Sequence, residues 1–168
     1  YILVASGIMK LPITWRKLVI TTAVAWMVVS AATTFPFYLS YFHALAGGTE
    51  GGWKYAVDSN YDWGQDLKRL SIWAEKNNVD RLYLDYFGGG EPRYYLGSIY
   101  EPWQSAKGPP IGGASSKNYF AISATLRQGA FGRIVSGFER KPEDSYLWLR
   151  DLEPISRVGT SIFIYRMP

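Results

Sequence analysis

The strongest constraint on how this chain can fold is an apolar stretch, Leu18–Leu39, that carries no charged side chain. A helix rises about 1.5 Å per residue, so roughly 20 apolar residues cross the hydrocarbon core of a bilayer. A cleaved signal peptide is the alternative, because a short basic segment precedes the stretch. Against it, the stretch is longer than a signal-peptide core and another apolar segment, Tyr1–Met9, comes before the basic residues. The sequence therefore predicts a membrane-spanning helix over about residues 18–39, within a transmembrane region of residues 1–43.

The distribution of basic residues predicts the orientation of this span. Lys10, Arg16 and Lys17 precede it, and no cation follows its C-terminal end until Lys54. The positive-inside rule places the basic segment in the cytoplasm. We therefore expect an integral protein of the plasma membrane whose residues 44–168 form an extracytoplasmic domain. Because the chain opens inside an apolar run and without an initiator Met, we also expect it to be part of a longer polypeptide, with its first residues ending a preceding helix.

The overall charge does not favour nucleic acid as a partner. The net charge is +4 and the pI about 9.2, but three of the 18 basic residues lie before the span and all 14 acidic residues lie at or after Glu50. The domain after the span is thus nearly balanced, and it has no basic stripe to neutralise a row of phosphates.

The scarcity of Cys and His excludes several kinds of site. The chain has no Cys and one His, His43, which falls beside the aromatic residues expected at the outer membrane interface. Without other His residues, neither a catalytic zinc site nor a Ser-His-Asp triad away from the membrane boundary can be assembled.

After Gly48 the pattern alternates between strands and helices. Predicted strands cover residues 53–57, 81–87 and 119–124, and the closing strands over residues 155–166 are interrupted at Gly159. A helix is predicted over residues 63–77, with Trp63, Leu67, Leu70 and Ala74 on its apolar face, and short helices are predicted at Pro92 and over residues 144–151. Residues 98–117 are rich in Gly, Pro and Ser and predict a long loop. The fold class is therefore α/β: a small sandwich domain with a parallel or mixed sheet.

One polar run stands out as a candidate substrate-binding site. It lies between a predicted strand and a predicted helix, at the kind of edge where ligands bind to open α/β sheets. Carboxylates and amides beside an indole ring can hydrogen-bond sugar hydroxyls and pack against sugar C–H groups. The candidate residues are Asp58, Asn60, Asp62, Trp63, Gln65 and Asp66.

Two other interpretations of this run remain open. In the first, the run only shapes the chain: Asp62 caps the helix with Gln65 as its capping-box partner, Asp66 complements the helix dipole, and Trp63 enters the core. In the second, Asp58, Asn60 and Asp62 offer oxygen ligands to a divalent cation, although the pattern of a Ca²⁺ loop is incomplete. No cofactor is therefore assigned, and a divalent cation remains a possibility.

Two segments of the chain resemble a known family. The run PFYLSYFHALAGG at residues 36–48 and the run DSNYDWGQDL at residues 58–67 are similar to the C-terminal region of prokaryotic membrane glycosyltransferases. These enzymes are related to the dolichyl-phosphate-mannose protein mannosyltransferases of the GT-C superfamily. His43 departs from the Asn expected at its position. Shorter similarities extend nearly to the end of the chain, at residues 86–88, 121–123, 146–149, 153–154 and 159–162.

The resemblance implies a polytopic transferase that uses a polyprenyl-phosphate-linked sugar as donor and a glycan or protein as acceptor, outside the cytoplasm. In that family the catalytic acid lies in an early extracytoplasmic loop, to which no residue here corresponds, so we expect this fragment alone to be non-catalytic. Two alternatives remain: a membrane-anchored, non-catalytic glycan-binding module, and a purely structural domain.

Overall fold

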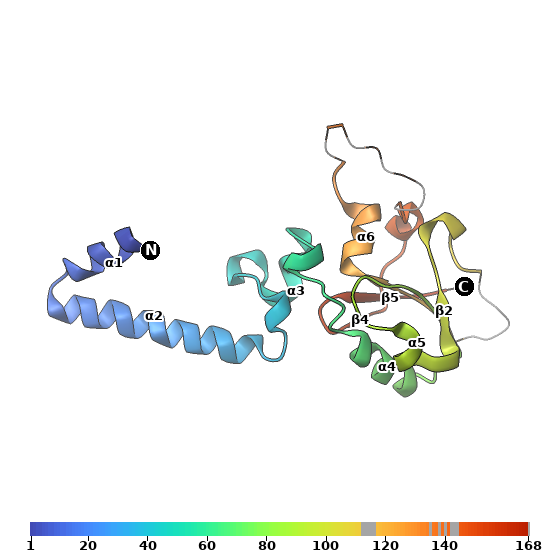
Figure 1. Ribbon diagram of the computed structural model, residues 1–168, viewed down its shortest axis with the longest axis horizontal. Helices are drawn as coiled ribbons and strands as arrows, with labels where there is room; N and C mark the ends of the chain where they lie inside the picture. The colour runs from blue at the N-terminus through green and yellow to red at the C-terminus, as the bar shows by residue number, and fades with distance from the viewer. Residues whose placement is uncertain (112–116, 135, 138, 140, 142–144, 168) are drawn as a thin grey trace. The chain divides into compact units, whose positions relative to one another are not determined.

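A computed structural model describes residues 1–111, 117–134, 136–137, 139, 141 and 145–167 of the chain (Figure 1). The chain divides into two compact units, Tyr1–Tyr38 and Leu39–Pro168. The first unit contains helices α1 (Ile2–Met9) and α2 (Ile13–Thr34). The second unit is α/β. Its helices are α3 (Gly48–Gly51), α4 (Leu67–Lys76), α5 (Pro92–Leu96) and α6 (Ala124–Phe131), and its strands are β1 (Arg81–Asp85), β2 (Tyr100–Pro102), β3 (Asn118–Ser123), β4 (Ser156–Val158) and β5 (Ile162–Arg166).

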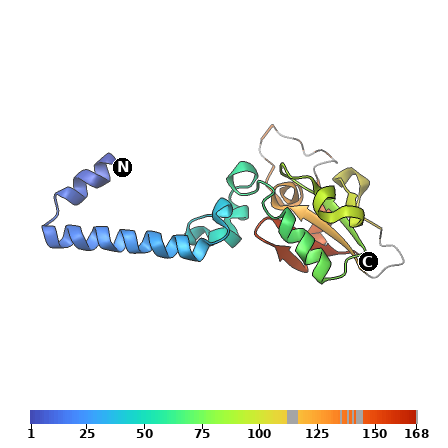
Figure 2. The same cartoon turned by 60° about the horizontal axis from the view of Figure 1, so that its bottom comes forward.

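Helix α2 is unbroken and is long and apolar enough to cross a membrane (Figure 2). Nearly all of its side chains are exposed, with Thr34 the single buried one. The helix begins at Ile13 and ends at Thr34, so the predicted bounds of 18–39 were shifted towards the C-terminus. Its end has a local cause: Pro36 disfavours helical geometry in the residue before it, and Phe35 accordingly has an extended backbone with ψ 134°.

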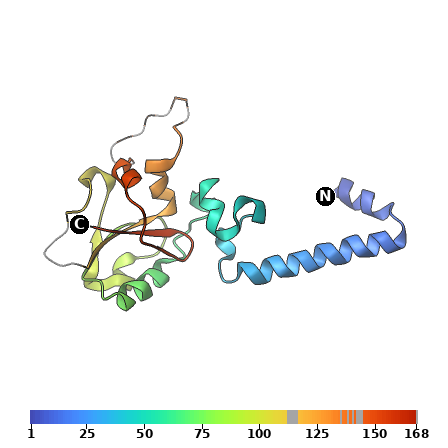
Figure 3. The same cartoon turned by 180° about the vertical axis from the view of Figure 1, so that it is seen from behind.

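The second unit is built on a mixed five-stranded sheet in the order β2-β1-β3-β5-β4 (Figure 3). Strand β1 pairs in parallel with both β2 and β3, whereas β5 is antiparallel to β3 and β4. The predicted mixed α/β sheet is confirmed. Because β2 and β3 flank β1, the carboxyl ends of all three strands lie at one edge of the sheet.

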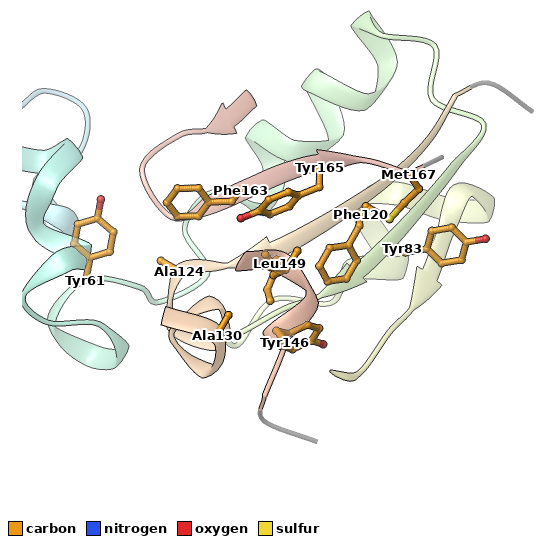
Figure 4. Packing of buried hydrophobic residues seen from close by; sticks show 11 residues of the cluster. Tyr61, Tyr83, Phe120, Ala124, Ala130, Tyr146, Leu149, Phe163, Tyr165 and Met167 are labelled. Atoms are coloured by element: carbon orange, nitrogen blue, oxygen red, sulfur yellow. The ribbon is translucent and has the colours of Figure 1, made fainter. Parts of the chain in front are cut away.

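The two faces of the sheet carry different side chains. On the face covered by α4 and α5, aliphatic residues such as Leu82, Leu84 and Ile164 form the core. The opposite face, towards α6, is rich in aromatic side chains (Figure 4), which belong to Tyr83, Phe120, Phe163 and Tyr165. In the registered pairs, Tyr83 lies opposite Phe120 and Phe120 opposite Tyr165, so these rings are cross-strand neighbours.

Period-two alternation predicted the strands well. Leu82 and Leu84 are buried together with Tyr86 packed against them, as the pattern over residues 81–87 indicated. Strand β3 and the pair β4 and β5, which are separated at Gly159, also agree with the predicted elements. Pro92 occupies the first turn of α5 as predicted.

The predicted strand over residues 53–57 was wrong. The chain there forms a short 3-10 helix, Gly52–Lys54, followed by a turn. Tertiary contacts fix this conformation: the Trp53 ring meets Phe163 edge-on at 5.2 Å between centroids, and its carbonyl accepts a 2.8 Å hydrogen bond from Gln128 Nε2 of α6.

The predicted helix over residues 63–77 begins four residues later, at Leu67, and ends at Lys76. Leu67, Leu70 and Ala74 are buried as predicted, but the expectation that Trp63 enters the core was wrong because its side chain is 58% exposed. The preceding residues fold into a turn in which Gln65 Oε1 accepts a 2.8 Å hydrogen bond from the Trp63 N–H.

Strand β2 and helices α3 and α6 were not anticipated, and two of the predicted segments are only partly described. Strand β2 lies inside the predicted loop over residues 98–117, of which residues 112–116 lie outside the described part of the chain. Helix α6 directly follows β3, with Ser123 at its N-cap position. The predicted short helix over residues 144–151 is a 3-10 helix, Leu147–Asp151, and Asp144 lies outside the described residues.

Candidate functional site

The polar run over residues 58–66 lies beside the carboxyl ends of β1 and β3. The Gly64 carbonyl accepts a 3.0 Å hydrogen bond from the Tyr86 hydroxyl, one residue beyond β1. The Asp58 N–H donates to Thr125 Oγ1 at 2.9 Å, at the start of α6. Ligands of open α/β sheets bind at this carboxyl edge. The run therefore lies at the kind of sheet edge where ligands bind. The strands that form this edge are separate from the run in sequence.

Asp66 is the most strongly held residue of the run. It is fully buried, and its Oδ2 accepts hydrogen bonds from the backbone N–H groups of Thr160 (2.7 Å) and Ser161 (2.9 Å) and from both hydroxyls, at 3.3 and 3.1 Å. Arg69 pairs with Oδ1 at 2.7 Å. Through these hydrogen bonds, Asp66 connects the start of α4 to the turn between β4 and β5.

Gln65 and Ser40 extend this arrangement. Gln65 Nε2 donates to Ser40 Oγ at 2.9 Å and to the Tyr61 carbonyl at 3.1 Å, and Ser40 Oγ lies 2.5 Å from Thr160 Oγ1. We refer to Ser40, Gln65, Asp66, Thr160 and Ser161 as the Asp66 network. Because its polar atoms form hydrogen bonds with one another in a largely buried setting, the network holds together three chain segments: Ser40, residues 65–66 and residues 160–161.

Tyr61 and Arg157 lie beside the Asp66 network. Tyr61 is fully buried, its hydroxyl lies 2.5 Å from the Thr49 carbonyl, and it receives a 2.5 Å hydrogen bond from Arg157 Nη2. Burial raises the pKa of Tyr61 to about 12, against the opposing effect of Arg157. Tyr61 therefore stays neutral at physiological pH and holds the segment around Thr49 in place.

Asp62 is a buried carboxyl group with one oxygen unsatisfied. Its side chain has no exposed surface; Oδ1 accepts a 3.1 Å hydrogen bond from the Gly64 N–H, and Oδ2 has no partner within the described residues. Burial raises the pKa of Asp62 to about 6, and the hydrogen bond from Gly64 limits the rise. Asp62 does not cap a helix, because Asp66 occupies the N-cap position of α4, so the capping-box interpretation was wrong.

The raised pKa of Asp62 predicts a specific pH dependence of stability. Since the folded-state pKa lies above the unfolded value of about 3.9, the folded protein binds the proton more tightly, and its free energy of unfolding falls as pH rises from about 4 to about 6. The ionised carboxylate then costs about 3 kcal/mol above pH 6. We expect Asp62→Asn to remove most of this fall, which denaturant unfolding at pH 4 to 8 would measure.

A matched control for this prediction is Glu75→Gln, since Glu75 is an exposed carboxylate on α4. This substitution should leave the pH profile between 4 and 6 unchanged. Identical pH profiles for the wild type and the Asp62→Asn variant would contradict the raised pKa.

Among the candidate binding residues of the run, Asp58, Asn60 and Trp63 are exposed. Asp58 adopts a positive φ of 57°, and its Oδ1 accepts a 2.6 Å hydrogen bond from the Ser59 N–H. Trp63 donates from its indole Nε1 to the Ser59 carbonyl at 2.9 Å, which orients the ring. These three side chains, with half-buried Gln65, can meet a ligand without rearrangement, whereas Asp62 and Asp66 are enclosed. Acceptor contact by the run stays a prediction.

Among the described residues, no group of three or more His, Asp or Glu side chains is placed to hold a metal ion. The run thus brings no carboxylate cluster together, and the hypothesis of a divalent cation at Asp58, Asn60 and Asp62 gains no support from the geometry.

A pocket that the sequence did not predict lies at the same carboxyl edge, next to the run. It has a volume of about 420 Å³ and lies at the ends of β1 and β2. Its polar and aromatic lining comprises Asp85, Tyr86, Tyr100, Trp103, Gln104 and Lys107. Most of these residues fall in the predicted loop over residues 98–117. The signal that could have found them is the close spacing of rings and polar side chains in YEPWQ, residues 100–104.

No family model, curated protein or solved structure matches this chain.

Proposed function

We propose that this chain is the C-terminal part of a polytopic membrane glycosyltransferase. The enzyme transfers a sugar from a polyprenyl-phosphate donor to an extracytoplasmic glycan or protein acceptor, and the α/β unit aids acceptor binding or supports the architecture. The resemblance of residues 36–48 and 58–67 to such enzymes motivates the proposal. The observation that carries it is the position of the polar run at a ligand-binding edge, in a unit joined to a helix of membrane-spanning length.

The proposed reaction is a displacement at the anomeric carbon of the donor sugar. A carboxylate removes the proton from an acceptor hydroxyl, the oxygen forms a bond to that carbon, and the bond to the lipid phosphate breaks with release of the phosphate. We assign no residue of this chain to the proton transfer, because the resemblance places the catalytic carboxylate upstream.

Transfer of labelled sugar from a polyprenyl-phosphate donor tests the proposal directly. The complete polypeptide in reconstituted membranes should transfer the label to endogenous acceptors, and removal of residues 39–168 should abolish or strongly reduce transfer. Absence of transfer by the complete polypeptide with any polyprenyl-phosphate hexose would overturn the proposal.

The orientation of α2 is testable by cysteine labelling, because the chain has no Cys of its own. Lys68 on α4 and Lys10 before α2 are exposed in the structure. A membrane-impermeant maleimide should label Lys68→Cys in intact cells, and Lys10→Cys only after permeabilisation, as the positive-inside rule predicts. The reverse pattern would place the α/β unit in the cytoplasm and contradict the proposal.

One observation favours a second candidate, a membrane-anchored module without catalysis. The side-chain contacts of Asp66 and Gln65 lie within the chain, as expected if the run serves architecture. The transfer assay separates the two candidates, since a module without catalysis would give no transfer by the complete polypeptide.

A further inference from the structure

The pocket at the carboxyl ends of β1 and β2 has the size and surface of a small-ligand site. Its volume of about 420 Å³ falls within the range of ligand pockets, about 300–1,000 Å³. Strand β1 forms one wall through Leu84 and Asp85, and β2 and the residues after it form another. The Trp103 N–H donates to the Leu84 carbonyl at 3.0 Å, so the second wall is fixed to the first by the backbone.

Aromatic side chains line much of this pocket. Trp103 meets Tyr83 edge-on at 4.9 Å between centroids, and its indole N–H donates to the Gly108 carbonyl at 2.9 Å. The Tyr86 hydroxyl is held between the Gly64 carbonyl and the Gly90 N–H. These rings are therefore held in place before a ligand binds. Rigid rings suit the apolar C–H groups of a sugar.

The polar groups of the pocket fall into two classes. Two are anchored: Asp85 accepts a short hydrogen bond from the buried Tyr146 hydroxyl, and Lys107 Nζ donates to the Pro102 carbonyl at 2.9 Å. In contrast, the half-buried Tyr100 hydroxyl and the exposed Gln104 amide make no hydrogen bond to the described residues, so water solvates them when no ligand is bound. Polar groups that face a pocket without a protein partner favour a ligand rich in donors and acceptors.

The charges around the pocket disfavour an anionic ligand. Asp85 and Lys107 line it with opposite charges. Burial and the Glu91 carboxylate raise the pKa of Tyr100, Arg93 lowers it, and Glu101 raises it further, so these groups also lie within electrostatic range. Acidic groups thus outnumber basic ones around the pocket. With three acidic and two basic groups in this range, the pocket offers a phosphate group no net attraction, and a neutral polyhydroxylated ligand needs none.

A peptide ligand fits the pocket less well than a sugar. Extended peptides are bound mainly through backbone hydrogen bonds along a strand edge. The edge strand beside the pocket, β2, has only three residues, and among the described residues the groups without a protein partner are the side chains of Tyr100 and Gln104.

We infer that this pocket binds one or two neutral sugar rings, through the rings of Tyr86, Tyr100 and Trp103 and the polar groups of Asp85 and Gln104. The assignment of the bound sugar to the acceptor rests on the proposed function. The inference that the pocket binds a sugar does not. The polar run supports one wall of the pocket, because the Gly64 carbonyl accepts a hydrogen bond from the Tyr86 hydroxyl.

Saturation-transfer NMR on the full chain in lipid nanodiscs tests this inference. The probes are the methyl glycosides of glucose, mannose, galactose and N-acetylglucosamine, together with inorganic phosphate and a Ser/Thr-rich peptide. We expect at least one glycoside to bind, and Tyr100→Phe and Gln104→Ala each to weaken it about fivefold, the effect of losing one neutral hydrogen bond. Both variants should fold, since neither removes a hydrogen bond to the described residues.

Tyr95→Phe is the matched control. It makes the same chemical change in a different pocket, of about 360 Å³, beside α4 and α5, and should leave glycoside binding unchanged. The inference is overturned if no glycoside binds, if the Tyr100 and Gln104 variants bind as the wild type does, or if phosphate or the peptide binds in place of the glycosides. Sugar transfer by the complete polypeptide is assayed separately. A failure of glycoside binding would therefore not contradict the proposed function, and a failure of transfer would not contradict sugar binding in the pocket.

Discussion

Asp66→Ala should destabilise the α/β unit by about 3–5 kcal/mol, a large fraction of the roughly 5–15 kcal/mol by which an ordinary domain is stable. The substitution removes the acceptor of two backbone N–H groups and two hydroxyls at Thr160 and Ser161, and it leaves the two backbone N–H groups buried without their acceptor. Urea unfolding of the chain in detergent, followed by Trp fluorescence, measures the effect.

Arg69→Ala separates the buried contacts of Asp66 from its ion pair. The Arg69 side chain is 36% exposed, so solvent weakens its ion pair with the fully buried Asp66, and this variant should lose clearly less stability than Asp66→Ala. Equal losses in the Asp66 and Arg69 variants would show that the four hydrogen bonds at Oδ2 contribute little.

Gly159→Ala should destabilise the unit to a similar extent. Gly159 has a positive φ of 56°, and a Cβ at this position would overlap the Asp66 carboxylate, whose own hydrogen bonds prevent it from moving aside. Strain in the left-handed region adds about 1–2 kcal/mol to this steric cost. We expect a poorly folded or strongly destabilised protein, which near-UV circular dichroism and urea unfolding would reveal.

Gly89→Ala is the control for this substitution, since nothing lies within 4 Å of the added Cβ and the substitution should be nearly neutral. A double-mutant cycle gives a stricter test. Because Asp66→Ala removes the side chain with which the new Cβ collides, Gly159→Ala should cost clearly less in that background. Additive effects of the two substitutions would contradict the steric explanation.

The sheet was predictable from the sequence where burial decides the structure. Alternation over residues 81–87 predicted the face that Leu82 and Leu84 bury, because successive side chains of a strand point to opposite faces. The break at Gly159 was predictable for a similar local reason, since glycine tolerates the positive φ that the turn requires.

The remainder depends on partners that are distant in sequence. The conformation at Trp53 is fixed by Gln128 and Phe163, and strand β2 exists because it pairs with β1. The polar run was expected to follow a strand over residues 53–57, which was wrong; it lies instead beside the ends of β1 and β3, through contacts with Tyr86 and Thr125. The roles of its carboxylates could not be read locally. The structural role of Asp66 depends on hydrogen-bond donors more than 90 residues away in the sequence. The burial of Asp62 depends on tertiary packing that no local sequence pattern indicates.

The Asp66 network has a consequence for biogenesis. It joins Ser40 and residues 65–66 to residues 160–161, and β5, which supplies an interior strand of the sheet, follows directly. During synthesis, the run and the sheet therefore cannot reach their final form until residues 160–166 have emerged. A polypeptide truncated before β4 would expose the apolar faces of β1, β2 and β3 and should be degraded. The unit can therefore fold only when β4 and β5 are present.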